Sequence, residues 1–187
     1  IEIPSLVKTI ENYLFRDCKS LKQVSISPET KSIGDYSFCG CSSLEQMSVP
    51  STVVSIGKDA FNGCKSLIYI FIPLSVISIG DNAFKSCSSL RSIIIPSSVK
   101  KIGESAFYFC TSLSDVSLST SLNSIEEKTF ELCKSLVQII IPSSVKSIGY
   151  KAFEYCPNLS KVIITSSRIK IDEGAFRDPS VIQKMEL

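Results

Sequence analysis

The sequence contains no histidine among its 187 residues. Without an imidazole, the Ser-His and Cys-His pairs that activate many nucleophiles are excluded, and so are the common zinc sites that use histidine. Neither G-x-x-x-x-G-K nor G-x-G-x-x-G occurs, so the phosphate-binding loops of nucleotide-dependent enzymes are also missing. We therefore expect no enzymatic activity, no cofactor and no metal in this chain.

Long runs of one kind of residue are absent as well. The net charge is only +2 and the two signs are mixed, which predicts neither nucleic-acid nor anionic-membrane binding. The longest apolar stretch, around residues 67–74, is far shorter than the ~20 residues that cross a bilayer, so we expect no membrane insertion. No signal peptide is visible and the first residue is not Met. We expect an excerpt of a longer protein or a processed product.

The chain does contain a repeat of 23 residues, most clearly marked by phenylalanine. The repeating phenylalanines are Phe15, Phe38, Phe61, Phe84, Phe107, Phe130, Phe153 and Phe176. Leucine keeps the same interval from Leu21 to Leu159, and Ile182 is expected to close that row. Eight units start near residues 3, 26, 49, 72, 95, 118, 141 and 164. Such a strict period predicts a solenoid, in which each unit buries its apolar face against the next, so we expect residues 1–187 to form one solenoid domain.

Each unit predicts two short extended segments and a compact turn. In "LIYIFIP", residues 67–73, alternating isoleucines predict a strand with one inward face, and the proline ends it because it has no N–H. A second strand is expected at 98–102, followed by Gly103 in a turn with positive φ. The segment "ESAFYFC", residues 104–110, is expected to form one or two turns of helix. Strands stacked at ~4.8 Å would give a parallel sheet on the order of 38 Å long.

The unit "IPSSVKSIGYKAFEYCPNLSKVII" at 141–164 and its seven siblings resemble the BspA-type leucine-rich repeat. The resemblance implies a leucine-rich-repeat solenoid with a parallel β-sheet on one face and short helical turns on the other. Proteins of this family look like surface or secreted adhesins of mucosal bacteria and parasitic protozoa, reported to bind host matrix proteins and cells. The resemblance therefore also implies a cell-surface or secreted location for this chain. The last unit departs from the pattern, with Arg168 in place of valine and Pro179 in place of cysteine.

Seven of the eight cysteines follow the repeat: Cys18, Cys41, Cys64, Cys87, Cys110, Cys133 and Cys156. We interpret them as a ladder of buried thiols that act as small apolar residues. The alternatives are a disulfide framework or a metal site, against which stand the odd number and the absence of histidine. Cys39 lies outside the register, in a C-x-C with Cys41. It is expected to be a partly exposed thiol that could oxidise or dimerise the protein, the alternative being a redox or metal role.

The outward positions of the strands are where a partner could bind. Most are polar, but Tyr69, Phe71 and Ile94 are apolar, and Arg91 lies beside them. Aromatic residues and arginine dominate the energetics of protein interfaces, which favours binding of another protein through the sheet face. The resemblance adds a host extracellular-matrix or cell-surface protein as the candidate partner. The alternative is that these residues simply favour strands, or that a flanking domain covers them.

A second apolar row lies in the predicted helical turn. Phe109, Leu132 and Tyr155 occupy one position in three consecutive units, and Tyr108 precedes Phe109. The stripe predicts an edge for self-association, as a homo-oligomer, or for docking of another part of the parent protein. Alternatively, these rings fold back over the ridge between units. Two functions therefore stay open, a protein-recognition or adhesion module and a structural or self-assembling spacer that projects or docks another domain.

Overall fold

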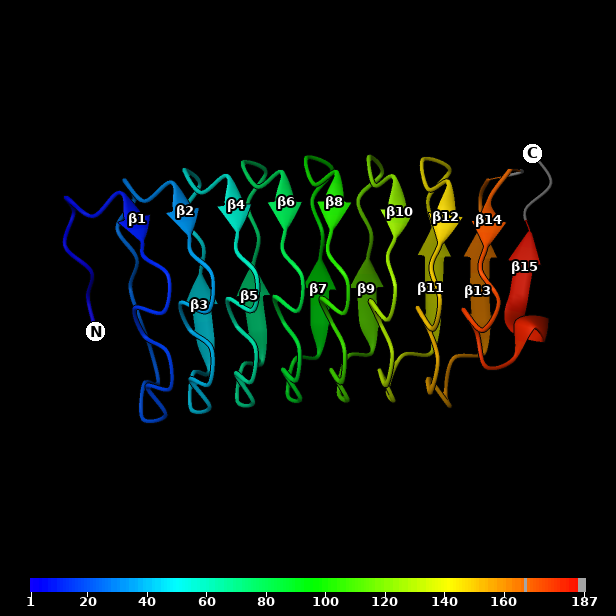
Figure 1. The fold of residues 1–187 in the computed structure, drawn as a ribbon, viewed down its shortest axis with the longest axis horizontal. Helices are drawn as coiled ribbons and strands as arrows, with labels where there is room; N and C mark the ends of the chain where they lie inside the picture. Colours follow the sequence, from blue (N-terminus) through cyan, green and yellow to red (C-terminus); the bar gives the residue numbers. More distant parts are fainter. Residues whose placement is uncertain (167, 185–187) are drawn as a thin grey trace.

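The computed structural model describes residues 1–166 and 168–184. Residues 167 and 185–187, which belong to the predicted domain and its eighth unit, lie outside the described residues. The chain winds into a straight, elongated coil of parallel strands, with the N-terminus at one end and the C-terminus near the other (Figure 1). The solenoid predicted from the repeat is confirmed.

Two ladders of parallel strands run along the coil. The strands of the first ladder are β1 (Thr9–Ile10), β2 (Ser32–Ile33), β4 (Ser55–Ile56), β6 (Ser78–Ile79), β8 (Lys101–Ile102), β10 (Ser124–Ile125), β12 (Ser147–Ile148) and β14 (Lys170–Ile171). Those of the second ladder are β3 (Gln46–Ser48), β5 (Tyr69–Phe71), β7 (Ser92–Ile94), β9 (Asp115–Ser117), β11 (Gln138–Ile141), β13 (Lys161–Ile164) and β15 (Ile182–Lys184). The arrows of the two ladders point in opposite directions in Figure 1, as expected when the chain crosses from one ladder to the other in every unit.

The core fills the space between the two ladders. The repeated phenylalanine rings stack face to face along the coil, with centroids 5.0–5.4 Å apart and planes within 12° of parallel. Beside them, each cysteine from Cys41 onward donates its S–H to the carbonyl of the phenylalanine 26 residues earlier, at 3.0–3.3 Å. A small apolar residue that still carries a weak donor suits this place, because the phenylalanine carbonyl would otherwise be buried with fewer partners.

The prediction of helical turns is wrong. The one helix in the described part of the chain is the 3₁₀ helix η1 (Pro179–Val181). In the turn of the second unit, the N–H groups of Tyr36 and Phe38 donate to Lys58 O and Ala60 O of the next unit, both at 2.8 Å. Only the alternate N–H groups bond within the unit, so no α-helix can form. Left-handed backbone at Tyr36 (φ 56°) also interrupts a helical path.

The prediction of positive φ at Gly103 is also wrong. The glycines with positive φ are Gly40, Gly63 and Gly174, which lie elsewhere in their units. Gly103 is required for a different reason, since a Cβ there would lie 2.7 Å from Asp81 Cα in the preceding unit. Glycine therefore allows neighbouring units to approach at this position rather than allowing an unusual turn.

Both ladders are interrupted at the junction of the fifth and sixth units, and the second ladder is also interrupted between the third and fourth units. The first ladder divides between β8 and β10, and the second divides between β5 and β7 and between β9 and β11. Inside the first ladder the Gly103 N–H donates to Ile79 O at 2.9 Å. At the junction Glu126 replaces that glycine, and within the described chain its N–H forms no equivalent bond. The separation of β8 from β10 therefore coincides with the unit in which a larger side chain replaces the glycine.

The last unit is shorter than expected. Ile182 pairs with Val162 rather than taking the position of Leu159, so the prediction that Ile182 closes the leucine row is wrong. The helix η1, capped by the Asp178 carboxylate on the Ser180 N–H at 2.9 Å, replaces part of the repeat. A hollow of about 310 Å³ beside Val181 lies where the regular units have a packed core.

Candidate interaction surfaces

The outward side chains of β5 and β7 form an exposed apolar group. Tyr69, Phe71 and Ile94 are 45%, 52% and 63% exposed, whereas Ile70 and Ile93 between them are buried. Strand alternation causes this difference, because successive side chains point to opposite faces. The structure thus brings three of the four predicted sheet-face residues onto one outer face.

Two further apolar residues, not predicted from the sequence, extend this group. Ile68 and Leu74, which flank β5, are exposed. The Arg91 N–H donates to Ile68 O at 3.3 Å, so the exposed Arg91 lies directly beside Ile68 in the next unit. The six residues Ile68, Tyr69, Phe71, Leu74, Arg91 and Ile94 are called the sheet-face cluster below. Ile68 could have been found by aligning the units, since it stands 23 residues before Arg91.

The sheet-face cluster rises between two hollows. Serine occupies this position on either side of Phe71 and Ile94, as Ser48 in the unit before Phe71 and Ser117 in the unit after Ile94. A hollow of about 400 Å³ lies beside Tyr69 over β3, and one of about 490 Å³ lies between β9 and β11. The second has Val116 in its lining and follows the interruption of the ladder.

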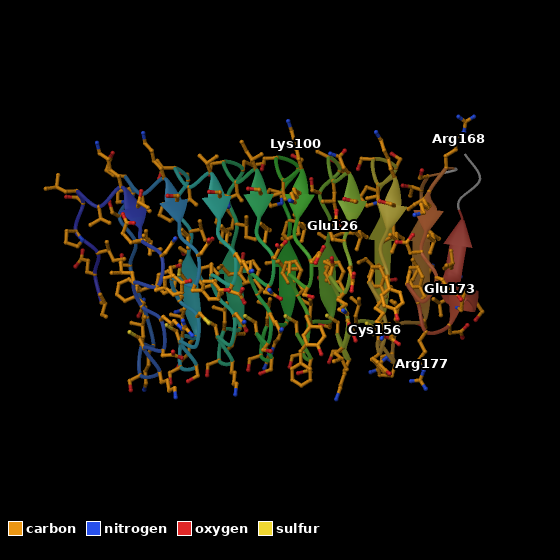
Figure 2. All side chains as sticks on the ribbon, viewed as in Figure 1. Lys100, Glu126, Cys156, Arg168, Glu173 and Arg177 are labelled. Atoms are coloured by element: carbon orange, nitrogen blue, oxygen red, sulfur yellow. The ribbon has the colours of Figure 1, made fainter. Side chains whose placement is uncertain are left out.

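The compact turns lie along another edge of the coil, called the turn edge below, on the lower side of Figure 2, where Cys156 and Arg177 are labelled. Phe109 and Tyr155 are 39% and 49% exposed there, and Leu132 is partly buried. All three have left-handed backbone, with φ of 59°, 54° and 62°. Other units place Gly40 or Gly63 at this position, where glycine carries no steric cost. Each bulky residue here costs ~1 kcal/mol of backbone strain.

Tyr108 lies beside this row, on the same edge. Its ring centroid is 6.3 Å from that of Phe109, and Lys85 Nζ lies 5.1 Å from the Tyr108 centroid. The rings therefore pack partly against one another, but Phe109 and Tyr155 still present apolar surface outward. The structure places all four predicted edge residues on this side of the coil.

The cysteines do not form a reactive site. All eight are unbridged, and burial raises the pKa of Cys41 and Cys110 to about 12, so these thiols stay protonated. Cys39 is half-buried, and burial raises its pKa too. Cys18 differs from the prediction of a buried thiol, because it is exposed in the first unit. In residues 1–166 and 168–184, no three His, Cys, Asp or Glu side chains are grouped to hold a metal ion.

The described part of the chain also has no helix with the length and apolar character needed to cross a bilayer. The fold is instead that of known bacterial leucine-rich repeat proteins. A leucine-rich repeat protein from Bacteroides ovatus has a TM-score of 0.78 and 26% identity, over 98% of this chain and 62% of that chain. The T. pallidum leucine-rich repeat protein has a TM-score of 0.75 and 30% identity, over 91% of this chain and 72% of that one.

A third similar structure is a leucine-rich cell surface protein from Faecalibacterium prausnitzii, with a TM-score of 0.62 and 29% identity over 99% of this chain and 58% of that chain. The chain thus spans less than two thirds of the Bacteroides and Faecalibacterium proteins. Among curated proteins, none matches. The family model for the BspA type leucine rich repeat region matches residues 1–113 and 55–183, in six copies. The chain belongs to the BspA-type leucine-rich repeat family.

Proposed function

We propose that this chain is a non-enzymatic recognition module, and that it binds another protein through the sheet-face cluster. The observation that carries the proposal is the exposure of Tyr69, Phe71 and Ile94 on the consecutive strands β5 and β7, between two hollows. Large apolar side chains lose water when a partner covers them, which favours binding. Leucine-rich repeat domains generally mediate contacts between proteins, and their fold is typically non-enzymatic.

Host extracellular-matrix and cell-surface proteins are the first candidates for the partner. The similar protein from Faecalibacterium prausnitzii is a cell surface protein, which supports a surface or secreted location for this chain. Residues 1–187 would act there as one solenoid domain. Its repeated units hold the sheet-face cluster on a straight scaffold, so one face can meet a large partner without a conformational change.

The test is binding of the chain to immobilised extracellular-matrix proteins and host cells. Tyr69→Lys/Phe71→Lys removes two apolar contacts and adds two charges at exposed sites, so it should weaken binding at least about tenfold while the fold is kept. Phe109→Lys, on the turn edge, is the matched control and should bind like the wild type. Equal binding by all three forms, or none by the wild type, would contradict the proposal; circular dichroism checks folding.

The second candidate is a structural spacer that self-assembles or docks another domain through the turn edge. The strained backbone of Phe109, Leu132 and Tyr155 favours it, since bulky residues are kept where glycine would fit without cost. Light scattering distinguishes the two candidates. A spacer grows in mass with concentration, loses that growth in Phe109→Lys, and binds no foreign protein.

A further inference from the structure

The hollow over β3 differs in chemistry from the apolar sheet-face cluster, although both include Tyr69. Its volume of about 400 Å³ lies within the ~300–1,000 Å³ that is typical of small-molecule sites. Buried apolar side chains form part of its lining, and the exposed part consists of Gln23, Ser25, Gln46, Ser48 and Tyr69. The hollow therefore combines two amides, two hydroxyl groups and one aromatic ring.

These five side chains form two parallel rows across three consecutive units. Gln23 pairs with Gln46, and Gln46 pairs with Tyr69, at the same level of adjacent strands. Because adjacent strands stand ~4.8 Å apart, this row is about 10 Å long. Ser25 and Ser48 lie two residues further along their segments, which places the second row about 7 Å away on the same outer face. The spacing thus gives a flat patch the size of a small ligand.

The polar side chains of the patch are available to a ligand, because the protein uses backbone atoms at these positions. The Gln23 carbonyl accepts a hydrogen bond from the Ile1 ammonium at 3.0 Å, and the Ser25 N–H donates to Ile1 O at 2.9 Å. In the hollow between β9 and β11, by contrast, the Thr165 hydroxyl already donates to Ile141 O at 3.0 Å. Amides and hydroxyl groups both donate and accept hydrogen bonds, so the patch matches a ligand that carries several hydroxyl groups.

The charge around the hollow favours a neutral ligand. Among the described residues, none that lines the hollow carries a charged side chain. The exposed charged residues that border it are Glu2, Lys22 and Glu45, two acids and one base. An acidic or basic ligand would lose water in the hollow without gaining an ion pair there, which costs free energy.

The Tyr69 ring adds a flat apolar surface at one end of the row of amides. The ring face carries partial negative charge and attracts C–H groups, which are slightly positive. A sugar ring has C–H groups on its face and hydroxyl groups around its rim, so it can stack on Tyr69 while the rim reaches Gln46. The hollow between β9 and β11 lacks this combination, since it has Gln138 at the repeat position of Gln46 but Asp115 at that of Tyr69.

We propose that the hollow over β3 binds a neutral sugar of a glycan, with Tyr69 stacked on the sugar ring and the amides of Gln46 and Gln23 bound to its hydroxyl groups. The hollow is shallow, so the dissociation constant for a single sugar is in roughly the millimolar range. The glycan can belong to a glycoprotein or to a free polysaccharide, because both present the same chemistry. The inference goes beyond the proposed function and does not depend on it, since β7 with Ile94 lies on the other side of β5.

Titration of the chain with sugars, followed by NMR of its backbone amides, tests the site. The probes are glucose, galactose, mannose, fucose and N-acetylglucosamine, each to about 100 mM, and at least one should shift the signals of β3 and Tyr69 to saturation. The acidic sugar N-acetylneuraminic acid should bind more weakly than that probe. No saturable shift at β3 or Tyr69 with any of the neutral sugars would overturn the proposal.

Substitutions at exposed positions separate the parts of the site. Tyr69→Leu removes the ring and Gln46→Leu removes the amide, so each should weaken sugar binding at least about fivefold, whereas Tyr69→Phe keeps the ring and should stay within about twofold. Gln138→Leu, the same change at the same repeat position, is the matched control and should bind like the wild type. Equal binding by Tyr69→Leu and the wild type would overturn the proposal.

Phe71→Lys separates this site from the proposed protein interface. Phe71 is outside the lining of the hollow, so this variant should keep sugar binding even where it loses a protein partner. Immobilised asialofetuin, a glycoprotein, and galactomannan, a neutral polysaccharide, distinguish the two sources of the glycan. Binding to either that Gln46→Leu weakens supports the site, and binding that Gln46→Leu leaves unchanged contradicts it.

Discussion

The first unit and the inner units carry the same residue types in the same places but bury them differently. Phe38 and Cys41 of the second unit are fully buried, whereas Phe15 is only partly buried and Cys18 is exposed. The Cys41 thiol donates to the Phe15 carbonyl in the unit before it. Within the described residues, the Cys18 thiol donates to no such carbonyl. A side chain of the repeat is thus buried by its neighbouring unit rather than by its own.

This difference shows where the stability of the coil lies. A single unit has two short strands and a turn whose N–H groups are partly satisfied by the next unit, so it cannot be stable alone. Stability then depends mainly on the interfaces between units, as in a one-dimensional array. A substitution at an interface between two inner units should therefore lower the free energy of unfolding more than the same substitution at the interface of the first unit.

The largest effect is expected for Phe107→Ala. The Phe107 ring stacks between two others, at 5.3 Å and 5.4 Å, and is fully buried, so its loss should cost ~3–5 kcal/mol of unfolding free energy. Phe15→Ala removes a ring with one stacked neighbour, at 5.2 Å, and should cost about half as much. Equilibrium unfolding in urea measures both. Equal losses of unfolding free energy in the two variants would mean that the contribution of a ring does not depend on how many adjacent units cover it.

A smaller effect, ~1–3 kcal/mol, is expected for Gly103→Ala, which inserts a methyl group between two inner units. The methyl group would lie 2.7 Å from Asp81 Cα, and both units are held on their other sides. Gly34→Ala creates a similar clash, with 2.6 Å to Ile10 O, but against the first unit, which can shift away. Gly34→Ala should therefore lower the unfolding free energy less than Gly103→Ala does.

Hydrogen exchange distinguishes these two glycine variants. Gly34→Ala should speed exchange in the first unit alone, whereas Gly103→Ala should do so on both sides of its junction. Asp172, in the last unit, also replaces the glycine, yet its N–H keeps the bond to Ile148 O at 2.9 Å. The comparison between the first and the inner units predicts that the last described unit also accepts this larger residue. Faster exchange at distant units in Gly34→Ala would contradict it.

The sequence predicted the fold where each unit's pattern was sufficient. The period of Phe107 and its equivalents led to the solenoid, and the alternation around Ile70 led to the strands. The helical turn was wrong because the N–H groups of residues such as Tyr36 bond to the next unit, which a local pattern cannot reveal. The glycine conformation was wrong for a similar reason, since Gly103 is constrained by Asp81 in another unit.

The surfaces were only partly accessible to sequence reasoning. Alternation placed Tyr69 and Phe71 outward, but the hollows beside them depend on serines in adjacent units and on a break in the ladder. Glu131 is buried, which sequence reasoning did not predict, because an acidic residue in a turn normally indicates solvent exposure.

Alkaline pH should weaken the inner interfaces by about 1.4 kcal/mol per pH unit for each fully buried thiol. The pKa of Cys110 is raised to about 12 in the folded chain, from 9.0. Below pH 9 the thiol is protonated in both states and its contribution is complete. Between pH 9 and 12 only the unfolded chain ionises, so stability falls as pH rises. Urea unfolding at a series of pH values measures this effect. Between pH 9 and 12, the unfolding free energy of Cys110→Ala should fall less steeply than that of the wild type or of the control Ser114→Ala. Equal slopes would contradict the assignment of the loss to the Cys110 thiol.

The smallest effect is expected for alkylation of Cys18, which should change stability by less than about 0.5 kcal/mol because its side chain lies at the surface. Iodoacetamide should modify Cys18 first and Cys39 more slowly, since Cys39 is half-buried and its pKa is raised by burial. Cys87 should stay unmodified until the chain unfolds, because both adjacent units cover it. Peptide mapping by mass spectrometry gives the three rates. Labelling of Cys87 at the rate of Cys18 would show that inner units separate as readily as the first, and the contrast between them would disappear.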